Sequence, residues 1–173
     1  MVSRRYYTPL KFQLHPCALL YDVCAMPVIG GPYLTVAFLC EKALTEVDGV
    51  PSFIRIVDKW TVTGTTETML PTLINATLVV LMRSGIHRGS SQLTIVPTTP
   101  AGAVMPPMII PVSFEGDDDH GTGFVQPIGF PAQESGLYWF DVSIDSQPIT
   151  KIPLRIVYLR IAQPPGPPTG ATS

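Results

Sequence analysis

The sequence predicts an all-β fold, an antiparallel β-sandwich of about eight strands with immunoglobulin-like or C2-like topology. Three observations predict it. Short apolar segments recur along the chain with turn residues between them. No segment has the apolar spacing of an amphipathic helix, and 19 prolines interrupt the chain. Proline cannot donate to a strand ladder, so it is typical of sheet edges and loops.

The composition favours contact with other proteins. The 173 residues suffice for one domain with its own core. Hydrophobic residues make up 46 % of the chain and charged residues 14 %, below the ~25 % of ordinary soluble domains. Such a surface exposes neutral or apolar area, which favours another protein or a second copy as partner. The net charge of −2 gives no basic face for nucleic acid, and no apolar run reaches the ~18 residues of a membrane helix.

The first part of the chain, residues 1–32, has no regular period and is expected to be a poorly ordered leader. Two other interpretations stay open. Residues 3–7 read Ser-Arg-Arg-Tyr-Tyr, which resembles a twin-arginine export signal, although no clear cleavage site follows. Alternatively, the true start is Met26. At the other end, residues 163–173 are rich in Pro and Gly and are expected to be disordered, which leaves 33–162 as the domain.

The cysteines favour a reducing compartment. Cys17, Cys24 and Cys40 form no disulfide framework and do not have the spacing of a zinc site. Cys40 lies in an apolar segment and is expected to be a small buried residue. The sequence therefore predicts a cytoplasmic protein.

Four segments in the first half of the chain define the predicted strands and one turn. Tyr33–Lys42 is apolar on both faces, which is typical of a central strand. Asp48-Gly49 is a turn signal. Ser52–Thr63 is predicted as one continuous strand, and Leu73–Arg83 as the next. The apolar face predicted for Ser52–Thr63 contains Ile54, Ile56, Trp60 and Val62, with Asp58 among them.

Three further strands are predicted over Gln92–Val96, Met108–Phe114 and Phe124–Phe130. The second contains Pro111 and the third Pro127. Both are therefore expected to lie at sheet edges.

The clearest element is a long hairpin over Ser135–Ile161. In its first arm the apolar side chains alternate with polar ones, which is the period of a half-buried strand. The residues from Asp145 to Pro148 are typical of a turn. The inward face of the first arm is predicted to consist of Tyr138, Phe140, Val142 and Ile144. Tyr138 and Phe140 are expected to be largely buried, together with Trp60 of the earlier strand.

Two motifs carry a resemblance. One combines residues 38–42 (Phe-Leu-Cys-Glu-Lys), 46–49 (Glu-Val-Asp-Gly) and 52–58 (Ser-Phe-Ile-Arg-Ile-Val-Asp). The other combines 135–140 (Ser-Gly-Leu-Tyr-Trp-Phe) with 153–156 (Pro-Leu-Arg-Ile). Over roughly residues 33–161 the chain resembles an uncharacterised bacterial family of small proteins, a domain of unknown function. The resemblance implies a compact domain that starts just before its first strand, which favours Met26, and it supplies no site residues.

The densest polar cluster lies in the loop Glu115–Gly123, which contains Asp117, Asp118, Asp119 and His120. Sandwich loops with several carboxylates can bind calcium, which needs six to eight oxygen ligands. Three consecutive aspartates point in alternating directions if the segment is extended, so they do not converge on one ion. We therefore expect exposed aspartates and no tight ion site.

Asp58 is the other candidate carboxylate, because it falls on an apolar face. A buried charge is normally paired, and Arg55 or Arg155 could supply the partner. A structural ion pair is therefore the preferred interpretation.

No catalytic constellation emerges. His15, His87 and His120 are scattered over the leader and the loops, no nucleophile-elbow motif occurs, and no glycine-rich phosphate loop joins a strand to a helix. The sequence predicts no catalytic, cofactor-binding or metal-binding residue. The function expected is that of a non-catalytic protein–protein interaction or structural module. The alternatives are a metal- or ligand-binding sandwich that uses the Glu115–Gly123 loop, and an enzyme of unrecognised class.

Overall fold

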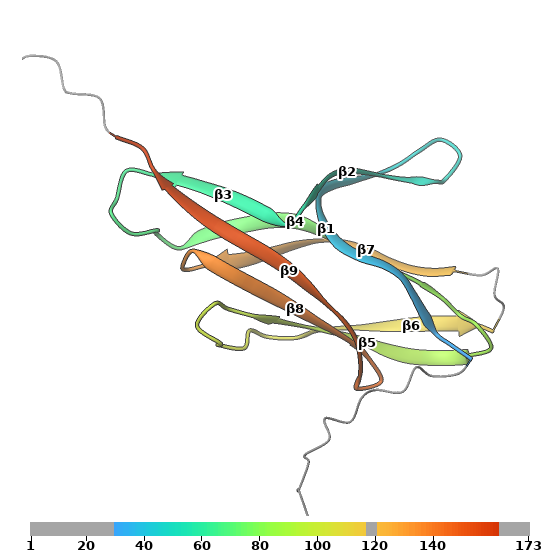
Figure 1. Cartoon of the computed structure of the whole chain (residues 1–173). Coiled ribbons are helices and arrows are strands. Elements are labelled where there is room, and N and C mark those ends of the chain that lie inside the picture. Colours follow the sequence, from blue (N-terminus) through green and yellow to red (C-terminus); the bar gives the residue numbers. More distant parts are fainter. Residues whose placement is uncertain (1–29, 117–120, 163–173) are drawn as a thin grey trace, which may run out of the picture.

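The structure, a computed structural model, describes residues 30–116 and 121–162, which form nine strands in two sheets (Figure 1). The strands are β1 (Tyr33–Thr45), β2 (Pro51–Val57), β3 (Lys59–Gly64), β4 (Thr72–Arg83), β5 (Arg88–Thr98), β6 (Met108–Glu115), β7 (Gly121–Ala132), β8 (Gly136–Ile144) and β9 (Gln147–Arg160). The predictions for the leader and the tail concern residues that are largely outside these ranges.

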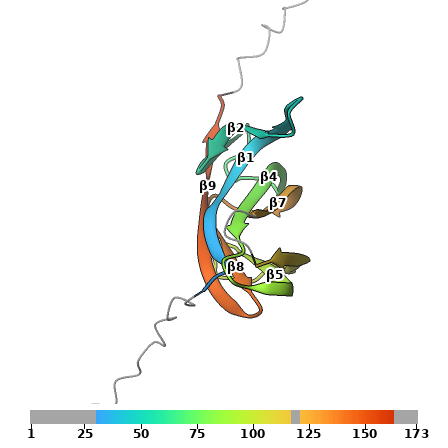
Figure 2. The ribbon, with the colours of Figure 1, turned by 90° about the vertical axis from the view of Figure 1, so that its right-hand side faces the viewer.

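The two sheets confirm the predicted sandwich. One has the order β2-β1-β4-β7, and the other has the order β3-β9-β8-β5-β6. Figure 2 gives the view at 90°, in which β4 and β7 form a layer separate from β9. All neighbouring strands pair antiparallel except β3 and β9, which are parallel. That parallel pair is not part of the antiparallel pattern expected from the sequence.

One core lies between the sheets. Alternate residues of β4 point inward, as do alternate residues of β8 and β9, because side chains along a strand alternate between its two faces. The largest fully buried side chains are Tyr138, Phe140, Leu39, Ile74, Leu78, Met82, Leu93, Ile95, Leu154, Ile156, Val79 and Val80. All of these except Val79 belong to the apolar cluster between the sheets.

The predicted long hairpin is confirmed as β8 and β9. Tyr138, Phe140, Val142 and Ile144 are all buried, as expected from their alternation. Asp145 and Ser146 both have positive φ, 46° and 68°, which is the geometry of a type I′ hairpin turn. Trp60 is less completely covered: it is partly buried and packs against the core cluster, so the prediction for this residue is confirmed only in part.

The single strand predicted over Ser52–Thr63 is in fact two strands in different sheets. β2 belongs to the four-stranded sheet and β3 to the five-stranded sheet, and Asp58 lies between them. Ile54 and Ile56 are exposed, whereas Val57 is buried, so the predicted inward face was wrong for β2. The physical reason is that β2 and β3 belong to the two facing sheets, which cover the core from opposite sides. The side chains keep alternating along the chain, so the face that points inward in β3 corresponds to the face that points outward in β2.

Both edge predictions are confirmed. β6, with Pro111, ends the five-stranded sheet, and β7, with Pro127, ends the four-stranded sheet. The two edges are joined by the hydroxyl of Thr122, which donates to the carbonyl of Ser113 at 2.7 Å. The β6–β7 side of the sandwich is thus linked across the two sheets.

The segment just before the predicted first strand already makes a backbone hydrogen bond to the rest of the domain. The carbonyl of Gly30 accepts a hydrogen bond of 2.7 Å from the backbone N–H of Ile86. A Cβ on Gly85 would lie 2.4 Å from that same carbonyl oxygen, so the close approach requires glycine. The segment that precedes β1 is therefore packed against the β4–β5 connection.

Candidate interaction surface

The hairpin formed by β1 and β2 leaves the four-stranded sheet. β1 pairs with β4 only as far as Cys40, which lies opposite Thr77. Beyond that point β1 continues to Thr45 and pairs with β2 alone. Figure 1 shows the tip of this hairpin extending clear of the neighbouring strands. We refer to residues 41–56 as the projecting hairpin.

Local sequence closes the projecting hairpin at its tip. The N–H of Glu46 donates to the carbonyl of Val50, and the N–H of Gly49 donates to the carbonyl of Glu46, both at 2.9 Å. Asp48 accepts from the N–H of Val50 through Oδ1 at 3.1 Å. Gly49 has a φ of 84°, a conformation that glycine adopts without strain. The predicted turn at Asp48-Gly49 is therefore confirmed.

Two side-chain contacts fix the base of the hairpin. Arg55 and Glu41, from opposite strands, form an ion pair of 3.1 Å. Arg55 has a φ of 52°, which is rare for a residue with a side chain and interrupts the regular course of β2. The rings of Phe38 and Phe53 meet edge to face, with their centroids 5.1 Å apart. Both contacts join the two arms of the hairpin to each other near its base.

The hairpin exposes an unusual number of apolar side chains. Exposed apolar side chains that gather on one element can mark a binding surface. The exposed side chains are Leu44 (38 %), Val47 (109 %), Val50 (56 %), Ile54 (44 %) and Ile56 (65 %).

A shallow groove runs where the hairpin departs from the sheet. β4 extends for five residues beyond its last pairing with β1, so its segment 72–76 has no β1 partner there. The polar lining residues are Glu41, Lys42, Asn75 and Thr77, and the apolar ones are Ala43, Ala76, Pro127, Ile128 and Gly129. We call this the hairpin groove. It combines apolar walls with unpaired strand backbone, which are the features that bind extended peptides.

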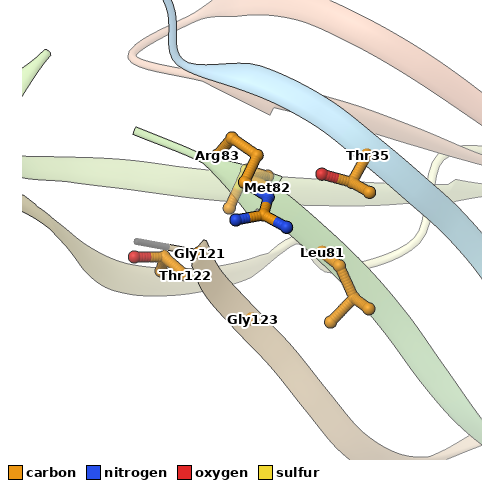
Figure 3. A pocket seen from close by; sticks show the side chains of 7 residues that line it. All are labelled: Thr35, Leu81, Met82, Arg83, Gly121, Thr122 and Gly123. Carbon is orange, nitrogen blue, oxygen red and sulfur yellow. The ribbon is translucent and has the colours of Figure 1, made fainter. Parts of the chain in front are cut away.

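A second hollow lies at the other end of the four-stranded sheet (Figure 3). It exists because Gly121 and Gly123 lie opposite Arg83 and Leu81 and fill no space. A Cβ on Gly123 would come within 2.8 Å of the Leu81 side chain. Figure 3 shows the charged group of this hollow, the Arg83 guanidinium, which lies between Thr35 and the Gly121–Thr122 backbone. Among the described residues, the lining of this hollow contains no carboxylate or imidazole.

One polar cluster brings together a serine, a histidine and an aspartate. His87 Nε2 lies 3.0 Å from Ser91 Oγ, and the His87 ring meets Phe114 edge to face. Asp145 accepts from the N–H of Gln92 at 2.8 Å. This hydrogen bond is the largest cause that lowers the pKa of the Asp145 carboxyl. The hydrogen bond from the Ser91 hydroxyl and the charge of His87 lower the pKa further, whereas desolvation raises it.

The order of groups in this cluster differs from that of a catalytic triad. Ser91 stands between His87 and Asp145, whereas a triad histidine stands between the serine and the acid. Ser91 is also buried. The cluster ties the start of β5 to the β8–β9 turn, because the N–H of Asp145 donates back to the carbonyl of Gln92 at 3.0 Å. Sequence reasoning missed it, since Asp145 is far from His87 and Ser91 in the chain.

The ion pair predicted for Asp58 is not formed. Asp58 is exposed at the crossing between the sheets, and Arg55 pairs with Glu41 instead. Asp58 interacts with Arg155 through the backbone, where its carbonyl accepts from the Arg155 N–H at 2.8 Å. Cys40, as predicted, is fully buried, and burial raises the pKa of its thiol.

The acidic loop lies partly outside the described residues. β6 ends at Glu115, and Gly121 and Gly123 belong to β7, so the loop is shorter than predicted. Asp117, Asp118, Asp119 and His120 fall outside the described ranges. Within those ranges, no three His, Cys, Asp or Glu side chains gather in a way that could hold a metal ion.

Comparisons with known proteins find little similarity. No family model matches the chain, and no curated protein does. One similar solved structure is the CARDB domain of a Pyrococcus furiosus protein, crystallised in complex with di-metal ions. The identity is 9 %, the similarity covers 76 % of this chain and 98 % of that chain, and the TM-score is 0.39. The strand pairing described above defines an all-β sandwich without this similarity. Across residues 30–116 and 121–162, no helix is long and apolar enough to cross a membrane.

Proposed function

We propose that this protein is a non-catalytic interaction module that binds another protein through its projecting hairpin and the adjoining groove. The observation that supports the proposal is the exposure of five apolar side chains on one hairpin that stands clear of its sheet. Covering such side chains contributes about 25 cal/mol for each Å² of apolar area removed from water.

The hairpin suits this role because its two arms are cross-linked near the base and it is apolar where it projects. The Phe38–Phe53 contact and the Arg55–Glu41 pair hold its base. A preorganised surface loses less conformational entropy on binding, so more of the burial energy appears as affinity. The few charges at the groove, with Glu41 already paired, favour a partner segment that is apolar and extended.

The test is affinity capture from the organism that expresses the protein, followed by direct binding to the captured partner. The triple variant Val47→Ser, Val50→Ser, Ile54→Thr is expected to lose at least about tenfold in affinity, the equivalent of 1.4 kcal/mol. The matched control is Ile86→Ser, Val104→Ser, Ile109→Thr, which removes the same kinds of exposed side chains elsewhere. Equal binding by both triple variants would rule out the hairpin as the contact surface.

The resemblance to an uncharacterised bacterial family and the cysteine content support two accompanying inferences, a bacterial source and a cytoplasmic location. Tagging the protein and imaging or fractionating the cells tests the second. Recovery in an exported fraction would instead favour the twin-arginine interpretation of residues 3–7.

A further inference from the structure

The edge strand β3 presents an unpaired backbone on its outer side, with a single charged side chain, that of Lys59. β3 is the last strand of its sheet and pairs with β9 on one side only (Figure 1). The carbonyls of Asp58, just before β3, and of Gly64 accept hydrogen bonds from the N–H groups of Arg155 in β9 and of Ile161 just after it, each at 2.8 Å. The N–H and C=O of one residue point to the same side of a strand, and the side alternates along it. Even-numbered residues therefore face β9, and the backbone groups of 59, 61 and 63 face outward.

The other three edge strands carry features that block strand addition. β7 contains Pro127 and Pro131, and β6 contains Pro111, each without an N–H. β2 begins at Pro51 and is interrupted by the positive φ of Arg55. β3 has neither a proline nor a residue with positive φ. Among the four edges, it is the one suited to extend its sheet.

The sequence of β3 is complementary to itself. Antiparallel strands oppose residues whose backbone groups both face the partner, so two β3 strands can meet with Thr61 opposite Thr61. In that register Lys59 lies opposite Thr63, and Trp60 lies opposite Val62. Cross-strand Thr–Thr pairs and aromatic–β-branched pairs are favourable, and no like charges face each other.

We propose that two copies of this chain associate through their β3 strands, paired antiparallel about a two-fold axis at Thr61. The pairing joins the two five-stranded sheets into one continuous sheet and satisfies the outward groups of Lys59, Thr61 and Thr63 in both copies. It also reduces the exposure of Trp60 and Val62, which are half-buried in one copy. A two-fold contact closes on itself and leaves no open β3 edge for further growth. The surface is separate from the tip of the projecting hairpin, so this proposal and the proposed function can fail independently.

The experiment is sedimentation velocity of the full chain over a micromolar concentration series. The native protein is expected to be a dimer, and Thr61→Lys is expected to raise the dissociation constant about tenfold or more by placing two lysines opposite each other. Thr61→Glu should do the same, and an equimolar mixture of the two variants should recover the dimer. Gln126→Lys adds the same charge to an exposed position on β7 and is expected to remain dimeric.

Amide hydrogen exchange provides the second measurement. Lys59, Thr61 and Thr63 should be protected in the native protein and should exchange rapidly in Thr61→Lys, with thermal melting used to confirm that the variant folds. Thr61 is exposed, so the substitution itself leaves the core intact. A native protein that is monomeric throughout the series overturns the proposal. A Thr61→Lys variant that stays dimeric also overturns it. So does a dimer that is lost only when the projecting hairpin is altered.

Discussion

Replacing Phe140 by alanine tests the inward face of β8 directly. Phe140 is fully buried, and its ring meets Phe130 edge to face with the centroids 5.4 Å apart. Truncating a fully buried phenylalanine removes its transfer energy and leaves a cavity, so the free energy of unfolding should fall by about 3–5 kcal/mol. Urea denaturation followed by circular dichroism measures the change as a shift in midpoint with an unchanged slope.

The matched control is Ile109→Ala in the same sheet, where the side chain is 55 % exposed. It should cost roughly 1 kcal/mol or less, because much of the removed area is already in contact with water. A double-mutant cycle with Phe130→Ala should give a coupling of about 0.5–1.5 kcal/mol from the ring contact. If Phe140→Ala costs under ~1 kcal/mol, or no more than Ile109→Ala, the assignment of the inward face is wrong.

Three further outcomes are expected. Asp145→Asn should lower the free energy of unfolding by roughly 0.5–1 kcal/mol at neutral pH, a small effect because the carboxyl is exposed. The difference in stability between the native protein and the variant should disappear as the pH falls below about 4, because a carboxyl with a lowered pKa stabilises the fold only while it is ionised. If urea unfolding at acid pH still shows this difference in stability, the effect comes from the turn and not from the charge of Asp145. After Cys17→Ser and Cys24→Ser, the remaining thiol of Cys40 should react with a thiol reagent only on unfolding, because it is buried and its pKa is raised; rapid native labelling would contradict this. A chain that starts at Met26 should melt within a few degrees of the full chain, and a large loss in calorimetry would show that the leader contributes to the fold.

Local patterns predicted the parts of the fold that depend on neighbours in the sequence. The β8–β9 hairpin was predicted correctly because its alternation and its turn lie within one stretch of chain. The edge positions of β6 and β7 were predicted correctly because proline acts at its own residue. In both cases the physical cause is local, so the sequence displays it.

The division of Ser52–Thr63 into β2 and β3 depends on distant partners and was not predicted. β3 pairs with β9, whose paired residues lie 96 positions later in the chain, and nothing in its own sequence indicates that pairing. A signal was nevertheless present, because Asp58 interrupts the predicted apolar face at the point where the chain changes sheets. The groove beside the projecting hairpin was missed for the same reason, since it depends on where β1 and β4 separate.

The low charge content and the open β3 edge have a common physical consequence. Proteins protect sheet edges with charged side chains, prolines or irregular backbone. This chain has few charges, and its edges at β2, β6 and β7 rely on proline or on the positive φ of Arg55. β3 has a single charge, on Lys59 at its first residue, where the proposed two-fold register places it opposite an uncharged Thr63. A charge at that end discourages registers that bring two Lys59 side chains together but leaves the register centred on Thr61 favourable. The protection of this edge is thus selective, which is the pattern expected of a strand that pairs with one specific partner strand.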